Sequence, residues 1–335
     1  CDWSSDVCSS DLWAMSRRIL LAGGAGFIGS HLTDALLERG DAVVILDNLA
    51  TGQRKNLVGA LANPRCSIVE HDITQPLPTR GPMVERFDMV FDFASPASPS
   101  DFLTMPREIL AVGSVGTSNL IDRALADSAL FFLASTSEVY GDPLVHPQPE
   151  TYWGNVSSIG PRSCYDEAKR FSEALTMANQ RTRGLNSRIV RIFNTYGERM
   201  RPDDGRVVST FIRQALAGEA LTLYGDGSQS RSFCYISDLV RGLIAITEQE
   251  DQLPINLGNP AECTMRELAE TVVDLVAAPS EIVNVPMPPE REGDPLQRCP
   301  DIQRATSLLR WVPTVSLREG LGRMIEHYRE LEANA

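Results

Sequence analysis

The chain has 335 residues, of which 43% are hydrophobic, so it can bury a large core and contain two domains. Its net charge is −13 without a basic run, which argues against nucleic acid, and no apolar run approaches the roughly 18 residues of a membrane span. The seven cysteines form no C-x-x-C pair and the four histidines lie far apart, so we expect no disulfide framework, no metal site and a reducing, cytoplasmic compartment.

The first residues differ in composition from the rest of the chain. The stretch CDWSSDVCSSDL has no periodicity and carries two of the seven cysteines. We interpret residues 1–14 as a non-native leader, similar to a translated sequencing adapter, and expect the native protein to start near Met15. A natural disordered extension is the alternative, and it leaves the functional argument unchanged.

Apolar runs alternate with helical patterns in the first half of the chain. Residues 27–40 have helical spacing and end at a glycine, as helices commonly do. Because strands that alternate with helices build parallel sheets covered on both faces, we predict a doubly wound α/β domain. Buried strands are predicted at residues 17–24, 42–47, 66–72, 88–95 and 129–136.

The pattern changes from about Asn194, where short strands and helices mix and a proline-rich loop follows at 285–295. We predict a second, smaller domain of mixed α/β structure. The apolar stretches LVRGLIAI and PINLG are assigned to the first domain, so the boundary is discontinuous. The predicted division is 15–193 with 232–258 for the larger domain, and 194–231 with 259–335 for the smaller.

A glycine-rich loop joins the first predicted strand to the first helix. Gly23, Gly26 and Gly29 let the backbone approach a pyrophosphate at the positive end of a helix. Asp47 ends the next strand, about 20 residues on, where a carboxylate can bond the ribose of an adenosine. The context indicates a Rossmann domain that binds NAD in preference to NADP, although Arg54 lies nearby. A tight turn without a ligand is the alternative.

Other strand ends are expected to flank the same dinucleotide. The HD pair after the third strand and the stretch FASPAS after the fourth lie where adenine and ribose would be, although ordinary loop residues are the alternative. The predicted cofactor-binding residues are Gly23, Gly26, Phe27, Ile28, Gly29, Asp47, Asn48, Asp72, Ile73, Ala94 and Ser95, together with Tyr165 and Lys169.

The stretch PRSCYDEAKR places Tyr165 four residues before Lys169, which puts both on one face of a helix. A free tyrosine has a pKa near 10, but an ammonium and the positive charge of a nicotinamide both favour the phenolate. Tyr165 is therefore a candidate base. A surface pair without a function is the alternative.

These features occur in an order that resembles the extended short-chain dehydrogenase/reductase superfamily: the glycine loop, a Ser/Thr strand end in STSEVYGDP, and Tyr-x-x-x-Lys. The strings SPASP, GPRSCYDEAKR, RIFNTYG, DGRVVS and YGDGSQSRSFCYISDL narrow the resemblance to the UDP-glucuronate decarboxylase family, from about residue 17 to near residue 320. The resemblance implies an NAD-dependent conversion of UDP-glucuronate to UDP-xylose by oxidation at carbon 4, loss of CO₂ and re-reduction. It also implies a homodimer built from helices of the first domain.

The resemblance assigns roles to five residues near the strand end and the helix. Tyr165 takes the proton of the sugar 4-hydroxyl, Lys169 holds the nicotinamide ribose, and Thr136 bonds the same sugar oxygen. Ser137 replaces the aspartate that dTDP-glucose 4,6-dehydratases use as an acid, so dehydration is disfavoured. Glu138 is expected to manage the proton at carbon 5 or to position a water, with a salt-bridged loop carboxylate as the alternative.

The resemblance also implies that the smaller domain holds UDP and the sugar. Arginine suits this task because its planar fork binds two oxygens at once, although a surface salt bridge is the alternative for any one arginine. The predicted substrate-binding residues are Asn194, Arg206, Tyr224, Gln229, Arg231 and Arg298.

The chain departs from the family pattern at two positions. Relatives have an asparagine at the position of Gly113, and the resemblance implies that it supports the hydrogen-bond relay of the site. We therefore expect this departure to affect the reaction rate and the affinity for the cofactor. Ala168 stands where relatives often have glycine and is expected to favour the helix.

Two other functions are compatible with the sequence. A nucleotide-sugar 4,6-dehydratase or 4-epimerase uses the same fold and the same first oxidation. A non-catalytic NAD-binding sensor is a third hypothesis, against which the Thr136, Tyr165 and Lys169 set argues, because a pure binder needs no base.

Overall fold

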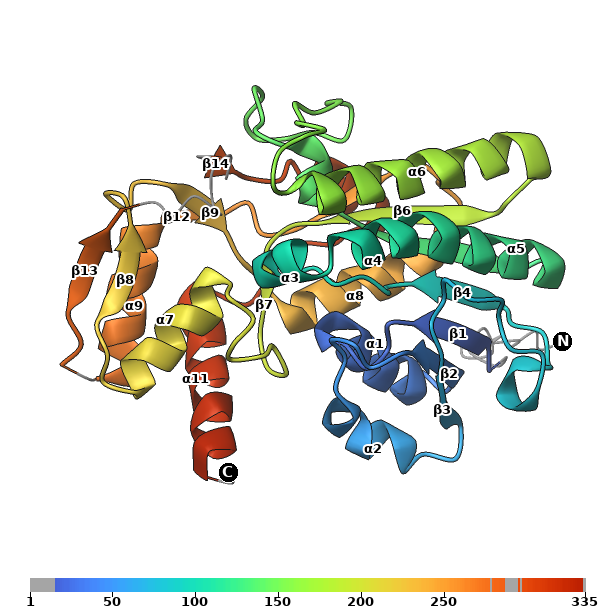
Figure 1. The fold of residues 1–335 in the computed structure, drawn as a ribbon, viewed down its shortest axis with the longest axis horizontal. Helices are drawn as coiled ribbons and strands as arrows, with labels where there is room; N and C mark the ends of the chain where they lie inside the picture. Colours follow the sequence, from blue (N-terminus) through green and yellow to red (C-terminus); the bar gives the residue numbers. More distant parts are fainter. Residues whose placement is uncertain (1–15, 278, 287–294, 296, 334–335) are drawn as a thin grey trace, which may run out of the picture.

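The computed structural model describes residues 16–277, 279–286, 295 and 297–333 (Figure 1). The predicted leader at 1–14 and most of the proline-rich loop lie outside the described residues. Within the part of the chain that the structure describes, every helix is too short or too polar to cross a lipid bilayer.

A parallel sheet of seven strands forms the larger part of the molecule, in the order β11-β6-β5-β4-β1-β2-β3. The five strands predicted for the first half of the chain all lie within their predicted ranges, and the doubly wound α/β class is confirmed. The strands are β1 (Arg18–Ala22), β2 (Ala42–Asp47), β3 (Cys66–Glu70), β4 (Met89–Asp92), β5 (Leu130–Thr136), β6 (Ser187–Ile192) and β11 (Ile255–Leu257).

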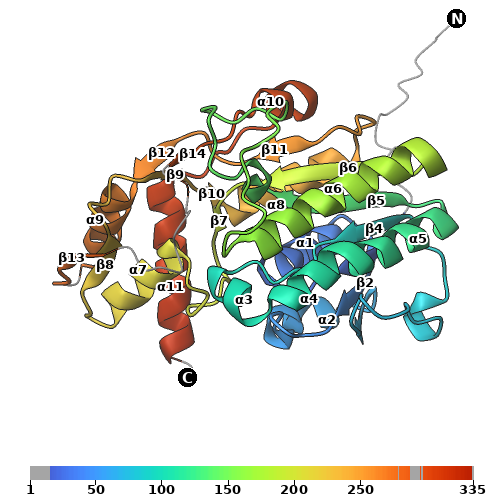
Figure 2. The ribbon, with the colours of Figure 1, turned by 45° about the horizontal axis from the view of Figure 1, so that its top comes forward.

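Helices cover both faces of this sheet, because successive side chains of a strand point to opposite sides. In β1, Ile19 and Leu21 join a core with α1, whereas Leu20 and Ala22 join a second core with α5. Figure 2 shows α4, α5 and α6 together on one side of the sheet. The helices of the two faces are α1 (Phe27–Glu38) and α8 (Ile236–Thr247) against α4 (Pro106–Ala111), η4 (Val112–Gly116), α5 (Thr117–Asp127) and α6 (Ser163–Arg183).

Short helical segments fill several connections of the larger part. They are η2 (Arg54–Leu57), α2 (Val58–Leu61), η3 (Gly81–Met83), α3 (Pro99–Thr104) and η5 (Ser137–Tyr140). The last two begin close to the carboxyl ends of β4 and β5, so they border the sheet edge at which ligands of this architecture bind.

Helices and small sheets form a second group of elements beside that edge of the large sheet (Figure 1). Strand β10 pairs with β7, β13 pairs with β8, and β12-β9-β14 form a three-stranded sheet. The strands are β7 (Thr195–Tyr196), β8 (Leu221–Tyr224), β9 (Ser230–Ser232), β10 (Cys234–Tyr235), β12 (Glu262–Thr264), β13 (Ile282–Val285) and β14 (Gln297–Arg298). The helices are α7 (Val207–Leu216), α9 (Met265–Val276) and α11 (Leu317–Ala333), whereas α10 (Gln303–Leu309) packs on β11 and α8 of the larger part.

The chain crosses between the two groups more than once. Strand β11 lies at the edge of the large sheet, and α8 packs on α1, although both follow the first segments of the smaller group in sequence. The division of the chain into domains at residues 193, 231 and 258 stays a prediction.

Candidate active site

A cleft of about 560 Å³ lies between the carboxyl edge of the large sheet and the smaller group of elements. Most of the predicted site residues line this cleft, although they come from segments far apart in the sequence. They are Gly23, Gly26, Phe27, Ile28, Gly29, Ser95, Thr136, Ser137, Glu138, Tyr165, Lys169, Asn194, Arg206, Tyr224, Gln229, Arg231 and Arg298. The predicted residues that do not line it are Asp47, Asn48, Asp72, Ile73 and Ala94.

The glycine loop leaves no room for side chains. Gly23 has a φ of +80°, and a Cβ built there would lie 2.5 Å from the carbonyl carbon of Phe93. A Cβ on Gly29 would lie 2.1 Å from the carbonyl oxygen of Gly23. Gly26 begins α1 without a side-chain cap, so free N–H groups and the positive end of the helix dipole meet the cleft. These residues fit the pyrophosphate of a dinucleotide.

The side chain of Asp47 forms hydrogen bonds with the backbone of this loop. Its carboxylate accepts hydrogen bonds from the backbone N–H groups of Ala25 and Leu49, each at 2.9 Å. Burial raises the pKa of Asp47, while these two bonds oppose the rise. Arg54 pairs with Glu70 at 3.7 Å, so it makes its ion pair away from Asp47. The contact of Asp47 with an adenosine ribose stays a prediction.

The other predicted adenine-side residues shape turns or the core. The Asp72 carboxylate accepts bonds from the N–H and hydroxyl of Thr74, at 2.9 and 2.8 Å, and Asn48 accepts one from the N–H of Ala50 at 3.1 Å. Ile73 is 4% exposed. Their contacts with a cofactor stay predictions.

Thr136, Tyr165 and Lys169 meet at the bottom of the cleft. Thr136 ends β5, and the other two lie one turn apart on α6, so a strand end faces one side of a helix. Each of the three is less than a tenth exposed. The Lys169 Nζ donates to the carbonyl of Ala134 at 2.9 Å and lies 5.9 Å from the centre of the Tyr165 ring. A side-chain hydrogen bond joins Tyr165 to Thr136.

Burial dominates the electrostatics of Tyr165. Burial, aided by the charge of Glu138, raises the pKa of Tyr165 to about 12, and Arg206 and Thr136 oppose this only in part. Burial also lowers the pKa of Lys169, which the carboxylate of Asp92 counteracts. Desolvation therefore dominates the pKa of Tyr165 in this structure, and the expectation that Lys169 and a nicotinamide favour the phenolate stays a prediction.

Glu138 lies between two arginines. Its carboxylate accepts a bond from Arg162 at 2.6 Å and a second bond from Arg298. Burial would raise the pKa of Glu138, but the two guanidinium groups together hold it far below its usual range. The two arginines therefore favour the ionised form of Glu138, and its two predicted roles, managing the proton at carbon 5 or positioning a water, stay predictions.

Two residues of this cluster were not assigned from the sequence. Arg162 lies in the quoted stretch PRSCYDEAKR, yet nothing in the local pattern showed that it reaches Glu138. Asp166 looked like an ordinary helix residue, but it is 6% exposed, and its Oδ1 has no partner among the described residues. Burial, followed by the charge of Glu138, raises the pKa of Asp166 to about 7.

The arginines that face the cleft from the smaller group are held by acceptors of the chain itself. Arg206 pairs with Asp204 at 2.9 Å and donates to the Ala97 carbonyl at 2.7 Å. Arg231 donates to the carbonyls of Ser230 and Pro295. We call Arg162, Arg206, Arg231 and Arg298 the arginine cluster.

Smaller polar groups complete this side of the cleft. The Gln229 side chain donates to the Tyr224 carbonyl at 3.3 Å. Asn194, which lies between β6 and β7, accepts a bond from the Cys234 N–H at 2.9 Å through its carbonyl. Bonds to the backbone therefore fix the position of both residues: the Gln229 side chain is bonded to a carbonyl, and the main chain of Asn194 is bonded to β10.

Gly113 and Ala168 face each other. Gly113 lies in η4, a π-helical turn packed on α6, and a Cβ there would be 2.8 Å from the Cβ of Ala168. The Gly113 carbonyl accepts a bond from the Ser172 hydroxyl at 2.7 Å. The two departures from the family pattern therefore lie in contact, so the residue at one position determines how much space is left at the other.

Comparison with known proteins agrees with this site. Residues 19–258 match the family described as "NAD dependent epimerase/dehydratase family". UDP-glucuronic acid decarboxylase 3 of Arabidopsis thaliana is 52% identical over 97% of this chain and 93% of its own length. UDP-glucuronic acid decarboxylase 1 of Danio rerio is 48% identical over 95% of this chain and 74% of its own length.

Solved structures share the fold over nearly the whole chain. A dTDP-glucose 4,6-dehydratase of Streptomyces venezuelae with NAD bound has a TM-score of 0.83 and 30% identity, covering 94% of this chain and 98% of its own. A mutant UDP-glucuronic acid 4-epimerase of Bacillus cereus, in complex with NAD and a fluorinated UDP-glucuronic acid, has a TM-score of 0.84 and 28% identity, covering 94% and 99%.

The chain belongs to the NAD-dependent epimerase/dehydratase family of the extended short-chain dehydrogenase/reductase superfamily, and its sequence relatives place it among the UDP-glucuronic acid decarboxylases. The predicted resemblance is confirmed. The chain is an enzyme, and NAD is its cofactor, as predicted.

Proposed function

We propose that this enzyme decarboxylates UDP-glucuronate to UDP-xylose in one site, with NAD regenerated in each turnover. The observation that carries the proposal is the meeting of Thr136, Tyr165 and Lys169 beside Glu138 in a cleft that the arginine cluster closes. The relatives that are about half identical over nearly the whole chain carry this activity in their names.

Tyr165 and Thr136 act on the sugar 4-hydroxyl. When bound, NAD supplies the hydride acceptor for carbon 4 and a positive ring that favours the phenolate. Thr136 orients the 4-oxygen and Tyr165 takes its proton, so carbon 4 becomes a ketone. Lys169 is fixed by the Ala134 carbonyl, and we assign it to the ribose of the cofactor.

The ketone then allows loss of CO₂. The bond from carbon 5 to the carboxylate breaks, and its electron pair enters the 4-ketone as an enolate. Glu138 carries no proton, so we assign it to orient the water that protonates carbon 5 and to hold Arg298 in place. Re-reduction at carbon 4 and return of the proton from Tyr165 to the 4-oxygen complete the cycle. The balance is UDP-glucuronate plus one proton to UDP-xylose plus CO₂.

Substrate binding falls to the arginine cluster and its neighbours. The guanidinium groups of the cluster bind the diphosphate and the sugar carboxylate, whereas Asn194, Tyr224 and Gln229 supply uncharged hydrogen-bonding groups. The side chains of Arg162 and Arg298 are 15% and 4% exposed, so their bonds are stronger than at an open surface.

The test is turnover of UDP-glucuronate in D₂O without added reductant, followed by NMR. We expect CO₂, UDP-xylose with deuterium at carbon 5, and no net NADH. Tyr165→Phe should reduce kcat by about 10²–10⁴-fold, because it removes the base. Tyr152→Phe is the matched control, since its hydroxyl accepts a bond from the Leu144 N–H and makes no other bond among the described residues. A 4-keto-6-deoxy product from dTDP-glucose, or epimers of a UDP-sugar without CO₂, would establish the dehydratase or epimerase alternative.

The homodimer is also a proposal. Leu103, Leu110, Val115 and Phe171 are 45–55% exposed on α3, α4, η4 and α6, and α4 packs directly against α6. A second copy of the chain covers this face, as the sequence resemblance implies. Phe171→Glu should shift the mass in light scattering to that of a monomer, while Ile159→Glu, at a residue 93% exposed elsewhere, should not. A monomeric wild-type protein would contradict the proposal.

A cytoplasmic location is proposed on the state of the thiols. The five cysteines of the described part of the chain, which are Cys66, Cys164, Cys234, Cys263 and Cys299, are free. Free thiols are usual in reducing compartments.

A further inference from the structure

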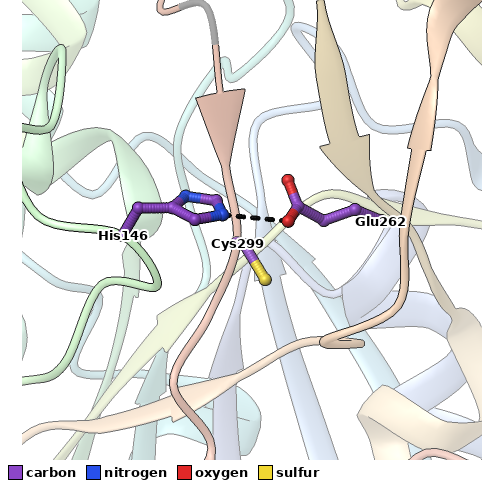
Figure 3. A group of neighbouring side chains, drawn as sticks. All are labelled: His146, Glu262 and Cys299. Atoms are coloured by element: carbon purple, nitrogen blue, oxygen red, sulfur yellow. Dashed lines mark hydrogen bonds and ion pairs between the residues drawn. The ribbon is translucent and has the colours of Figure 1, made fainter.

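Three side chains with metal-binding atoms meet outside the cleft (Figure 3). They are His146, Glu262 and Cys299, and their ligand atoms all lie within 4.8 Å of one another. The His146 Nε2 lies 2.9 Å from a carboxylate oxygen of Glu262, and the thiol of Cys299 lies beside this pair, where it donates to the Pro260 carbonyl at 3.4 Å. We call these residues the three-ligand cluster.

The cluster joins three segments that the sequence keeps apart. His146 lies in the loop before α6, Glu262 begins β12, and Cys299 directly follows β14. His146 and Glu262 are 116 positions apart. Sequence spacing therefore predicted no metal site, because the chain brings these ligands together only through the fold.

Backbone bonds fix the loop of His146 to the segment of Cys299. Gln148, which is fully buried, accepts a bond from the Cys299 N–H through its side chain at 2.9 Å and donates its own N–H to the Cys299 carbonyl at 2.9 Å. Its side chain also donates to the Val145 carbonyl at 2.8 Å. The positions of two of the three ligands are thus set before any ion binds.

The third ligand is held from its far side. One carboxylate oxygen of Glu262 accepts a bond from the Ser230 hydroxyl at 2.7 Å, and the other faces His146. Such a bond orients a ligating carboxylate, as the outer contacts of metal sites commonly do.

The donor set selects the class of metal. A thiolate, an imidazole and a carboxylate suit Zn²⁺ and similar borderline ions, whereas Ca²⁺ and Mg²⁺ require oxygen ligands throughout. A tetrahedral zinc with bonds of roughly 2.0–2.3 Å has ligand atoms roughly 3.4–3.6 Å apart, so side-chain movements of roughly 1 Å would close the cluster. His146 and Glu262 are 28% and 30% exposed, so water can reach the site and fill the fourth position.

The three-ligand cluster is also adjacent in sequence to an active-site residue. Arg298, which bonds Glu138 and the Gly141 carbonyl, directly precedes Cys299. An ion bound to Cys299 therefore fixes the short segment that carries this arginine.

We propose that His146, Glu262 and Cys299 form a site for a zinc-class divalent cation, which clasps the loop of His146 to β12 and to the segment of Arg298. On binding, the thiol of Cys299 loses its proton to solvent, and His146 exchanges its bond with Glu262 for a bond with the metal.

The test adds Co²⁺, a spectroscopic substitute for zinc, to the full-length protein with its NAD. We expect one equivalent to bind with a thiolate-to-cobalt charge-transfer band, and Zn²⁺ to displace it and raise Tm. Cys299→Ser should abolish the band. Glu262→Gln and His146→Gln, which preserve side-chain size, should weaken the affinity by about 10–100-fold. They keep the test valid if the buried Cys299→Ser variant fails to fold.

Two controls separate this site from other thiols. Cys66→Ser, on β3, and the double variant Cys1→Ser/Cys8→Ser should keep both the band and the affinity. The proposal is overturned if cobalt gives no thiolate band, if Cys299→Ser keeps it, or if the Cys1→Ser/Cys8→Ser variant loses it.

Discussion

The glycine loop and the arginine cluster face the same cleft, yet the chain builds them in different ways. The loop is formed by backbone: Gly23 and Gly29 allow strand, turn and helix to approach within distances that exclude a Cβ. The cluster is formed by long side chains from both groups of elements, each held by acceptors such as Glu138 and Asp204. The geometry of the backbone in this loop is determined by a short stretch of sequence, whereas a network of ion pairs depends on the whole fold.

The difference also predicts how each side fails. Nothing can relax around a Cβ that meets a carbonyl oxygen, so damage to the loop is severe and local. The cluster shares its charges, so loss of one member shifts the others. Substitutions on the two sides should therefore affect cofactor binding and turnover separately.

Gly29→Ala should have the largest effect. Its Cβ would lie 2.1 Å from the Gly23 carbonyl oxygen, so the loop must open and NAD binding should be lost. The NAD content of the purified protein, released by denaturation, measures this. Gly322→Ala in α11, where nothing lies within 4 Å, is the control and should keep its NAD and gain about 0.5–1 kcal/mol of stability. Full NAD occupancy in Gly29→Ala would show that the loop is not the pyrophosphate site.

Arg298→Gln should have the next largest effect. It leaves the ionised Glu138 with Arg162 alone, and truncation of one partner of a buried charge pair costs about 2–5 kcal/mol, so kcat/KM should fall by about 100-fold or more. NAD content should not change. Arg318→Gln, whose partner Asp274 is exposed, is the matched control. Equal losses of NAD and of turnover would mean that the two sides of the cleft are not separate.

Gly113→Asn should destabilise the protein by about 1–3 kcal/mol, because the new side chain meets the Cβ of Ala168 at 2.8 Å. The double variant Gly113→Asn/Ala168→Gly should recover part of this loss, because the carbonyl oxygen of residue 168 stays 3.0 Å from the new Cβ. Urea unfolding of the four proteins gives the coupling free energy. Strict additivity would show that the two positions do not share their space.

Asp166→Asn should have the smallest effect, and one that depends on pH. The pKa of Asp166 is raised to about 7, so the folded state binds its proton more tightly than the unfolded state does. Its stabilising contribution is complete below about pH 4 and is lost as pH rises through 7. The variant should therefore match wild type in Tm at pH 4 and exceed it by about 2–5 °C at pH 8.

Asp274→Asn, at an exposed carboxylate, is the control for this variant and should show no such dependence. An Asp166→Asn protein that is less stable than wild type at pH 8 would mean that Asp166 is ionised and favourably paired in the folded state.

The fold and the position of the glycine loop could be predicted from the sequence. The apolar runs fell on the strands of the sheet, and the spacing of Gly23, Gly26 and Gly29 predicted a loop whose geometry tolerates little else. Tyr165 and Lys169 were found because four residues on a helix is a local relation. Each of these signals spans a few neighbouring positions, where the chain geometry leaves few choices.

The missed features all depend on contacts between distant segments. Arg162 and Arg298 share Glu138 across 24 and 160 positions, and the pKa of Asp166 follows from burial beside them. The pKa of Tyr165 could not be predicted from its spacing to Lys169 for a related reason, because desolvation is a property of the packed site and not of the pair. The contact of Gly113 with Ala168 was likewise hidden in two separate substitutions.

That last contact constrains the order in which descendants of this chain can change. An asparagine at position 113 costs stability while alanine occupies position 168, whereas a glycine at position 168 costs only helix propensity. A lineage that regains the asparagine is therefore expected to replace Ala168 with glycine first, while Gly113 is still present. Two positions that would be counted as independent in a list of substitutions thus share one stability cost.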